Sequence, residues 1–128
     1  MELELEKQPS GYRFGSFSTH GVQIDNKIYT TSLIIMPDIL IPDWSPIAIE
    51  QLTSLHLSTI LDLQPELILL GTGYSQQFVR PDVLKDLPGR NIGIDIMSSR
   101  AACRTYNILA SEGRRVAAGI INDSRAFS

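Results

Sequence analysis

The fold of this chain is decided by residues 91–121, which read NIGIDIMSSRAACRTYNILASEGRRVAAGII. Isoleucines occupy every second position between Asn91 and Met97, and strict alternation of this kind predicts a β-strand. Either serine of the pair Ser98-Ser99 can cap a helix that runs to about Glu112, where a glycine follows as its stop. The apolar run from 115 to 121 predicts the next strand. Strand, helix and strand in this order predict parallel strands covered by a helix.

The segments upstream continue the same alternation of helix and strand. A helix is expected to start at Thr53 or Ser54, with Leu57, Ile60 and Leu61 on one face, and to end before Pro65. The continuous apolar run from Glu66 to Leu70 is typical of a strand that is buried on both faces of a parallel sheet. A short helix is expected to begin at Pro81, because proline suits the first helical position.

In the first part of the chain, apolar residues recur at the two-residue period that is typical of strands, with turn residues between the runs. Apolar and polar residues alternate from Tyr12 to Tyr29, with turn residues at His20-Gly21 and Asp25-Asn26, which predicts an antiparallel meander. Ser32–Met36 predicts a more deeply buried strand. The prolines between Pro37 and Pro46 argue against regular structure in that stretch, since proline lacks the backbone donor.

These elements together predict one α/β domain over residues 1–128. Its sheet is expected to be mostly parallel and flanked by helices, with an N-terminal antiparallel β meander added. Residues 1–10 and 123–128 are expected to be loose tails, because chain ends without an apolar pattern are commonly poorly ordered.

Composition excludes several classes of protein. With 43% hydrophobic and 20% charged residues the chain is typical of a globular domain, and its net charge of -3 argues against a nucleic-acid partner. No apolar run approaches the ~20 residues that span a bilayer, so no membrane insertion is expected. The acidic start, Met1–Glu6, is unlike a signal or transit peptide, and a cytoplasmic location is therefore predicted.

The sequence offers no catalytic constellation. Cys103 is the only cysteine, which excludes an internal disulfide and a thiolate metal cluster. The two histidines, His20 and His56, have no second ligand at metal spacing. We therefore predict no catalytic residue, no metal and no cofactor.

A ligand site, if present, is expected where two predicted strands end. Neighbouring parallel strands bring their carboxyl ends to one edge of a sheet, and ligands commonly bind there. Glycines allow close approach of a ligand, the start of a helix offers free amides to an anion, and Arg100 adds positive charge. The candidate ligand-binding residues are Gly71, Thr72, Gly73, Tyr74, Ser98, Ser99 and Arg100. The alternative is that the glycines only make a turn and the serines only cap a helix.

Other residues are candidates for contact with a protein partner. On the helix that follows Ser98, a polar stripe of Arg100, Arg104, Asn107 and Ser111 predicts either a recognition surface or a solvated face. Trp44, between two prolines, is either an interface anchor or a side chain folded back onto the sheet.

Several motifs also resemble a known family. Leu70–Gly73, Gly93–Met97, Ala102–Leu109 and Glu112–Val116 are similar to a family of unknown function, numbered four-nine-eight, that includes a mitochondrial assembly factor for NADH dehydrogenase (complex I). The resemblance implies a three-layer α/β fold with a central mixed sheet and no known reaction. Arg114 matches the arginine of the family and joins the candidates for interaction.

The resemblance and the missing catalytic groups together lead to two expectations about function. The first is a non-enzymatic protein-interaction module with a protein partner, which assists assembly of a respiratory membrane complex. The alternative is a protein that binds a small molecule or small anion, or a minor enzyme, with the loops at the carboxyl ends of the parallel strands.

Overall fold

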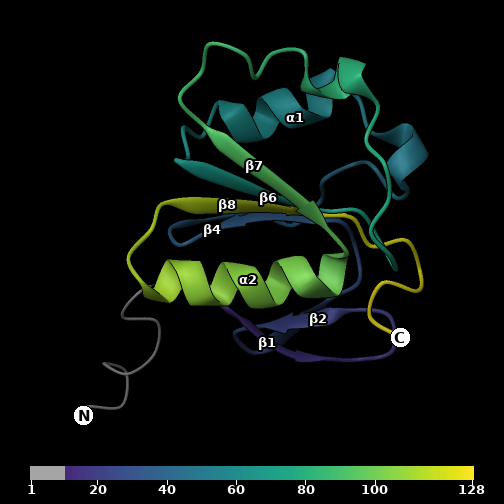
Figure 1. Ribbon diagram of the computed structural model, residues 1–128. Coiled ribbons are helices and arrows are strands. Elements are labelled where there is room, and N and C mark those ends of the chain that lie inside the picture. The colour runs from purple at the N-terminus through teal and green to yellow at the C-terminus, as the bar shows by residue number, and fades with distance from the viewer. Residues whose placement is uncertain (1–10) are drawn as a thin grey trace.

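The computed structural model describes residues 11–128, which form two β-sheets and the helices that cover them (Figure 1). The small sheet contains β1 (Phe14–Phe17), β2 (Val22–Ile24) and β3 (Lys27–Tyr29). The large sheet contains β4 (Leu33–Met36), β5 (Ile39–Ile41), β6 (Leu67–Gly71), β7 (Gly93–Met97) and β8 (Val116–Ile120). The helices are α1 (Ser54–Leu61) and α2 (Ser99–Ser111), with short 3-10 helices η2 (Ile49–Gln51) and η3 (Pro81–Leu84).

The large sheet is mixed, as expected. Its strand order is β5-β4-β8-β6-β7. Strand β6 pairs in parallel with both β7 and β8, whereas β4 pairs antiparallel with both β8 and β5. The parallel part is therefore limited to three neighbouring strands, and β8 joins it to an antiparallel hairpin.

The three expected layers follow from alternation along the strands of the large sheet. On one face, Leu33 and Ile35 of β4 pack with the buried side of α2 and with the small sheet. On the other face, Ile34 and Met36 pack with α1 and the segments around η2 and η3. Figure 1 shows α1 and α2 on opposite sides of the sheet, with β1 and β2 beside α2. The α/β fold with an added antiparallel meander is confirmed.

Both helices begin where the sequence predicts them. The Ser98 hydroxyl accepts a hydrogen bond from the amide of Ala101 at 3.3 Å and caps α2. Gly113, with φ of +83°, follows the end of α2 in the left-handed conformation that glycine adopts without strain. Helix α1 starts with a capping box, in which Thr53 and His56 exchange bonds between side chain and backbone.

The stretch from Pro37 to Pro46 contains a strand that the sequence analysis did not predict. Ile39–Ile41 forms β5, which pairs with β4 through a tight turn in which Met36 lies opposite Ile39. The prolines at positions 37 and 42 lie just outside the strand, so their missing N–H groups cost the ladder nothing. Strand β5 is at the edge of the sheet, where flanking prolines are common.

The expected C-terminal tail is packed at its end. Ala126 and Phe127 are 4% and 2% exposed, and the ring of Phe127 stacks on Phe17 with 5.3 Å between centroids. The prediction of a loose tail over 123–128 is therefore wrong for these residues, because the small sheet offers them an apolar surface. The other expected tail, residues 1–10, lies outside the described residues.

Gly119 in the middle of β8 is required by close packing. A Cβ at this position would lie 2.7 Å from Cδ1 of Ile60 and 2.9 Å from the ring of Trp44. These distances are below those of real contacts, and both neighbours are buried. The absence of a side chain on Gly119 therefore lets α1 and Trp44 reach the sheet.

We expect Gly119→Ala to lower the free energy of unfolding by about 1–3 kcal/mol, because overpacking a rigid core displaces its neighbours. Urea denaturation measures the change. Gly15→Ala is the matched control, since a Cβ at Gly15 meets only ordinary contacts at 3.6 Å. Equal midpoints for both variants would contradict the packing argument.

Candidate functional site

The carboxyl ends of the three parallel strands meet at one edge of the large sheet. Gly71 at the end of β6 lies opposite Met97 of β7 and Ile120 of β8. The segments 71–74 and 98–100 are joined by backbone bonds from the amide of Thr72 to the Met97 carbonyl and from the amide of Ser99 to the Gly73 carbonyl, both 2.9 Å. The predicted juxtaposition of the two loops is therefore present.

The polar groups of these loops bind each other. The Ser99 hydroxyl accepts from the amide of Gly73 at 2.9 Å and donates to the Ile121 carbonyl at 2.6 Å. Ser99 and Thr72 are completely buried, and a Cβ on Gly71 would lie only 2.7 Å from Cα of Ser99. The amides of Thr72, Gly73 and Ser99 are thus used within the chain. This geometry favours the alternative, in which glycines and serines build the edge.

The polar stripe on α2 faces the small sheet. The Asn107 side chain accepts from the amide of Phe14 at 2.9 Å and donates to its carbonyl at 2.8 Å. The guanidinium groups of Arg100 and Arg104 lie 4.3 and 5.7 Å from the ring centroid of Phe17, and Arg100 also donates to the Phe127 carbonyl at 3.0 Å. The stripe therefore docks β1 onto α2, a third possibility beside the recognition surface and the solvated face.

The other two candidates for interaction are Trp44, which lies inside the domain, and Arg114, which lies away from this edge. Trp44 is 6% exposed and packs over Gly119, so its ring is folded back onto the sheet and is not an exposed anchor. Arg114 lies before the amino end of β8 and pairs with Glu66. The hydrogen bond and charge of Glu66 raise the pKa of the Arg114 guanidinium. Arg114 is therefore at the opposite edge of the sheet from the loops 71–74 and 98–100.

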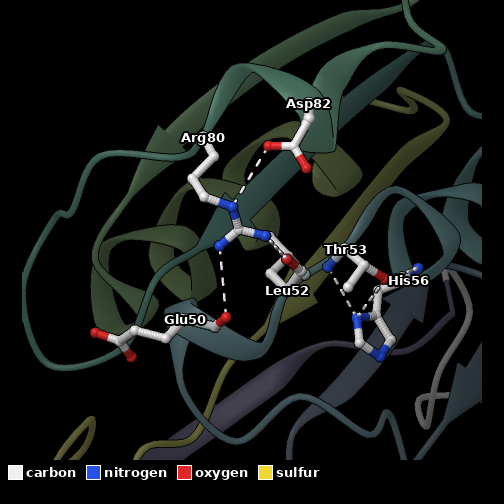
Figure 2. A network of polar contacts seen from close by, with 6 residues as sticks. All are labelled: Glu50, Leu52, Thr53, His56, Arg80 and Asp82. Atoms are coloured by element: carbon white, nitrogen blue, oxygen red, sulfur yellow. Dashed lines mark hydrogen bonds and ion pairs between the residues drawn. The ribbon is translucent and has the colours of Figure 1, made fainter.

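The loop that follows β6 is held firmly in place. The hydroxyl of Thr72 donates to the Ser75 carbonyl at 2.7 Å and accepts from the amide of Gln77 at 3.0 Å. At the far end of the loop, Figure 2 shows the Arg80 guanidinium between the carbonyls of Glu50 and Leu52, 3.4 and 2.6 Å away. Asp82 pairs with the same guanidinium at 3.4 Å. These contacts anchor the loop at both ends.

This anchored loop presents two aromatic side chains to solvent. Tyr74 is 53% exposed and Phe78 is 78% exposed, and Ile47 on a nearby segment is 59% exposed. Tyr74 is tied to the end of β8, because its amide donates to the carboxylate of Asp123 at 2.9 Å and its ring lies 4.6 Å below the guanidinium of Arg125. Sequence reasoning identified Tyr74 but missed Phe78, although an apolar residue in a polar loop is a readable signal.

Beside this edge, past the carboxyl end of β8, the surface is hollowed. One hollow of about 370 Å³ is lined by residues 30–32, 43–45, 47 and 122. A second, of about 530 Å³, shares Thr30, Ile47 and Asn122 with the first and adds His20 and residues 123–124. Sequence reasoning missed this feature, since its walls come from segments far apart in the chain.

The two buried groups Cys103 and Tyr106 are poorly placed for nucleophilic or acid–base chemistry. Cys103 is fully buried, and burial raises the pKa of its thiol well above the ordinary value. Burial also raises the pKa of Tyr106, whose hydroxyl donates to the Tyr12 carbonyl at 3.0 Å. Within residues 11–128 no three His, Cys, Asp or Glu side chains gather as metal ligands do. Nor does this part of the chain contain a helix with the length and apolarity needed to cross a bilayer.

Comparison with known proteins identifies the family. A family model described as "Protein of unknown function (DUF498/DUF598)" matches residues 11–121. The chain belongs to this family. The resemblance noted on Leu70–Gly73 and the α2 motifs is thereby confirmed.

Relatives of this DUF498 chain include named proteins and solved structures. The NADH dehydrogenase [ubiquinone] 1 alpha subcomplex assembly factor 3 of Danio rerio is 33% identical over 91% of this chain and 68% of its own length. The "13 kDa major membrane protein" of Francisella tularensis is 37% identical over 57% of this chain and 59% of its own length. The NMR structure of a Xanthomonas campestris protein superimposes with a TM-score of 0.79 and 40% identity, covering 97% of this chain and 94% of that one.

We expect Asn107→Ala to destabilise the domain by about 1–3 kcal/mol, because the amide and carbonyl of Phe14 lose their partners. Urea denaturation gives the size, and faster hydrogen exchange at the Phe14 amide gives the location. Asn91→Ala changes the same residue type at an exposed position and serves as control. Slow exchange at Phe14 in the Asn107 variant would contradict the docking role of the stripe.

We expect Cys103 in the folded protein to resist alkylation by iodoacetamide at neutral pH. The raised pKa keeps the thiol protonated, and burial excludes the reagent. Mass spectrometry counts the modified protein, and the same reaction in guanidinium chloride is the control that exposes the thiol. Rapid modification without denaturant would show that the thiol is accessible.

Proposed function

We propose that this chain is a non-enzymatic binding module that assists the assembly of a respiratory NADH dehydrogenase. One observation supports the binding role most directly: Tyr74 and Phe78 stand exposed on a loop that is anchored at both ends. Relatives named as assembly factors for that complex support the choice of partner.

Exposed aromatic side chains on a fixed loop are suited to binding a protein. Burial of a phenylalanine side chain contributes roughly 1.5–3 kcal/mol, and interfaces concentrate their binding energy in a few such residues. Because Thr72 and Arg80 already hold the loop, a partner would lose little further freedom on ordering it. We therefore propose the carboxyl edge around Tyr74 and Phe78 as the surface that meets the partner.

The anion-binding alternative has less support. The amide of Gly73 is bonded to Ser99, the amide of Ala101 to Ser98, and the Arg100 guanidinium donates to Phe127. An anion at these residues would have to replace bonds that are already made. The expected cytoplasmic location stays a prediction, which fractionation of the cells that make this chain would test.

We expect affinity capture of this chain from its native cells to recover NADH dehydrogenase subunits or their partly assembled forms. The double variant with Phe78→Ser and Tyr74→Ser should reduce the recovery of these proteins at least tenfold. A tenfold weaker affinity corresponds to a loss of about 1.4 kcal/mol of binding free energy. Quantitative mass spectrometry measures the ratio to wild type. Ile108→Ser is the matched control, because Ile108 is 60% exposed on α2 and outside the proposed surface.

Two outcomes would overturn this proposal. Recovery of no NADH dehydrogenase protein would remove the assembly role. Equal loss of recovery with the Ile108 variant would remove the proposed surface, since a general increase in polarity would then explain the result. A second measurement is the amount of assembled complex on native gels after deletion of the chain, which should fall.

A further inference from the structure

Two buried polar atoms that have no hydrogen-bond partner among residues 11–128 belong to side chains that line the same hollow. They are the indole nitrogen of Trp44 and the side-chain oxygen of Asn122. The two residues are only 6% and 7% exposed. A buried donor or acceptor that stays unpaired destabilises the folded state, so such atoms usually have a partner in the working protein.

The orientation of Asn122 is determined by its other bonds. Its side-chain nitrogen donates to the His20 carbonyl at 2.7 Å, and its backbone amide donates to the Ser32 hydroxyl at 2.8 Å. Since the His20 carbonyl can only accept, the amide group cannot be turned round, and the side-chain oxygen remains an acceptor. Trp44 supplies the complementary group, because an indole nitrogen only donates.

The chemistry of the walls limits what can occupy the hollow. Asp43 and Asp123 line the two connected hollows, and among residues 11–128 no lysine or arginine does. The Asp123 carboxylate accepts from the amides of Tyr74 and Arg125, while the Arg125 guanidinium lies over the Tyr74 ring. An anion would therefore be repelled, whereas a neutral or cationic molecule is favoured. Ile47 adds an apolar wall.

We propose that this hollow binds a small neutral or cationic molecule that carries a carboxamide or an equivalent donor and acceptor. The ligand's carbonyl accepts from the indole N–H of Trp44, and its N–H donates to the side-chain oxygen of Asn122. The volumes of about 370 and 530 Å³ lie in the range of small-molecule sites. Both polar atoms are closed to bulk solvent, so binding requires a displacement of the side chains that cover them. This site is separate from the protein partner proposed above.

Trp44 makes the proposal directly measurable. It is the only tryptophan of the chain, so both the intrinsic fluorescence and the single indole N–H signal in NMR spectra report on this hollow. The probes are Nα-acetyl-lysine N-methylamide and Nα-acetyl-glutamate N-methylamide, which share their amides and differ in the sign of the side-chain charge. Purified full-length chain is titrated with each.

We expect the lysine probe to move the indole signal saturably and to bind at least tenfold more tightly than the glutamate probe. Asn122→Ala should weaken binding of the lysine probe at least tenfold, and Asn91→Ala should not change it. Because Asn122→Ala also removes the bond to His20, Asp43→Asn is a second variant at an exposed position, with Asp86→Asn as its control. Asp43→Asn should lower the ratio of the affinity for the lysine probe to the affinity for the glutamate probe at least threefold.

Three results would overturn the proposal. The first is an indole signal that neither probe moves saturably, which would show that neither probe reaches Trp44. The second is equal affinity for the two probes, which would remove the charge argument. The third is unchanged affinity in Asn122→Ala, which would place the probe elsewhere. None of these results depends on whether the chain binds a NADH dehydrogenase subunit.

Discussion

Close approach of both helical layers to β8 is the constraint on which the rest of this structure depends. Strand β8 is buried along its whole length and contains two alanines and a glycine in sequence, Ala117, Ala118 and Gly119. It pairs with β4 on one side and β6 on the other, so it joins the antiparallel hairpin to the parallel strands. Larger side chains in β8 would push away the ring of Trp44 and Ile60 on one face and α2 on the other.

The same close packing determines how the carboxyl edge is built. Helix α2 can start directly beside β6 because Gly71 leaves room for the backbone of Ser99. The Ser99 hydroxyl then bonds to both Gly73 and Ile121, which joins the segments that follow β6 and β8. Because the polar groups of this edge bind each other, the surface features available to a partner lie beside it. They are the exposed side chains of Tyr74 and Phe78 on the loop after β6 and the hollow past β8.

Local signals predicted most of the fold. The capped helix after Ser98, the apolar run at Glu66–Leu70 and the alternating isoleucines each depend on neighbours in sequence, and each is where it was expected. Strand β5 was missed because its prolines lie beside the pairing residues, a distinction that needs the register of Met36 opposite Ile39. The loop pair at the edge was predicted because parallel strands have one carboxyl edge.

The features that sequence reasoning did not predict depend on contacts between distant segments. A polar stripe such as Arg104 and Asn107 has the same pattern whether it faces water, a partner or the backbone of another strand. Phe14 lies far from Asn107 in the chain, so no local sequence pattern shows that the stripe forms hydrogen bonds with the backbone of β1. The hollow is even harder to predict from the sequence, because its walls come from the ends of strands β3 and β8 and from the loop around Trp44.

Trp44 connects the core of the domain to the proposed ligand site. Its six-membered ring packs over Gly119 and determines how α1 sits on the sheet, while its indole nitrogen is one of the two unpaired buried atoms beside the hollow. A ligand that pairs with this nitrogen would therefore act on a side chain that the fold itself requires. Binding to the folded state alone stabilises it by RT ln(1 + [L]/Kd), so occupancy of the hollow and stability of the core are thermodynamically linked. Such a link is a physical route by which a small molecule can affect a binding surface on the neighbouring loop.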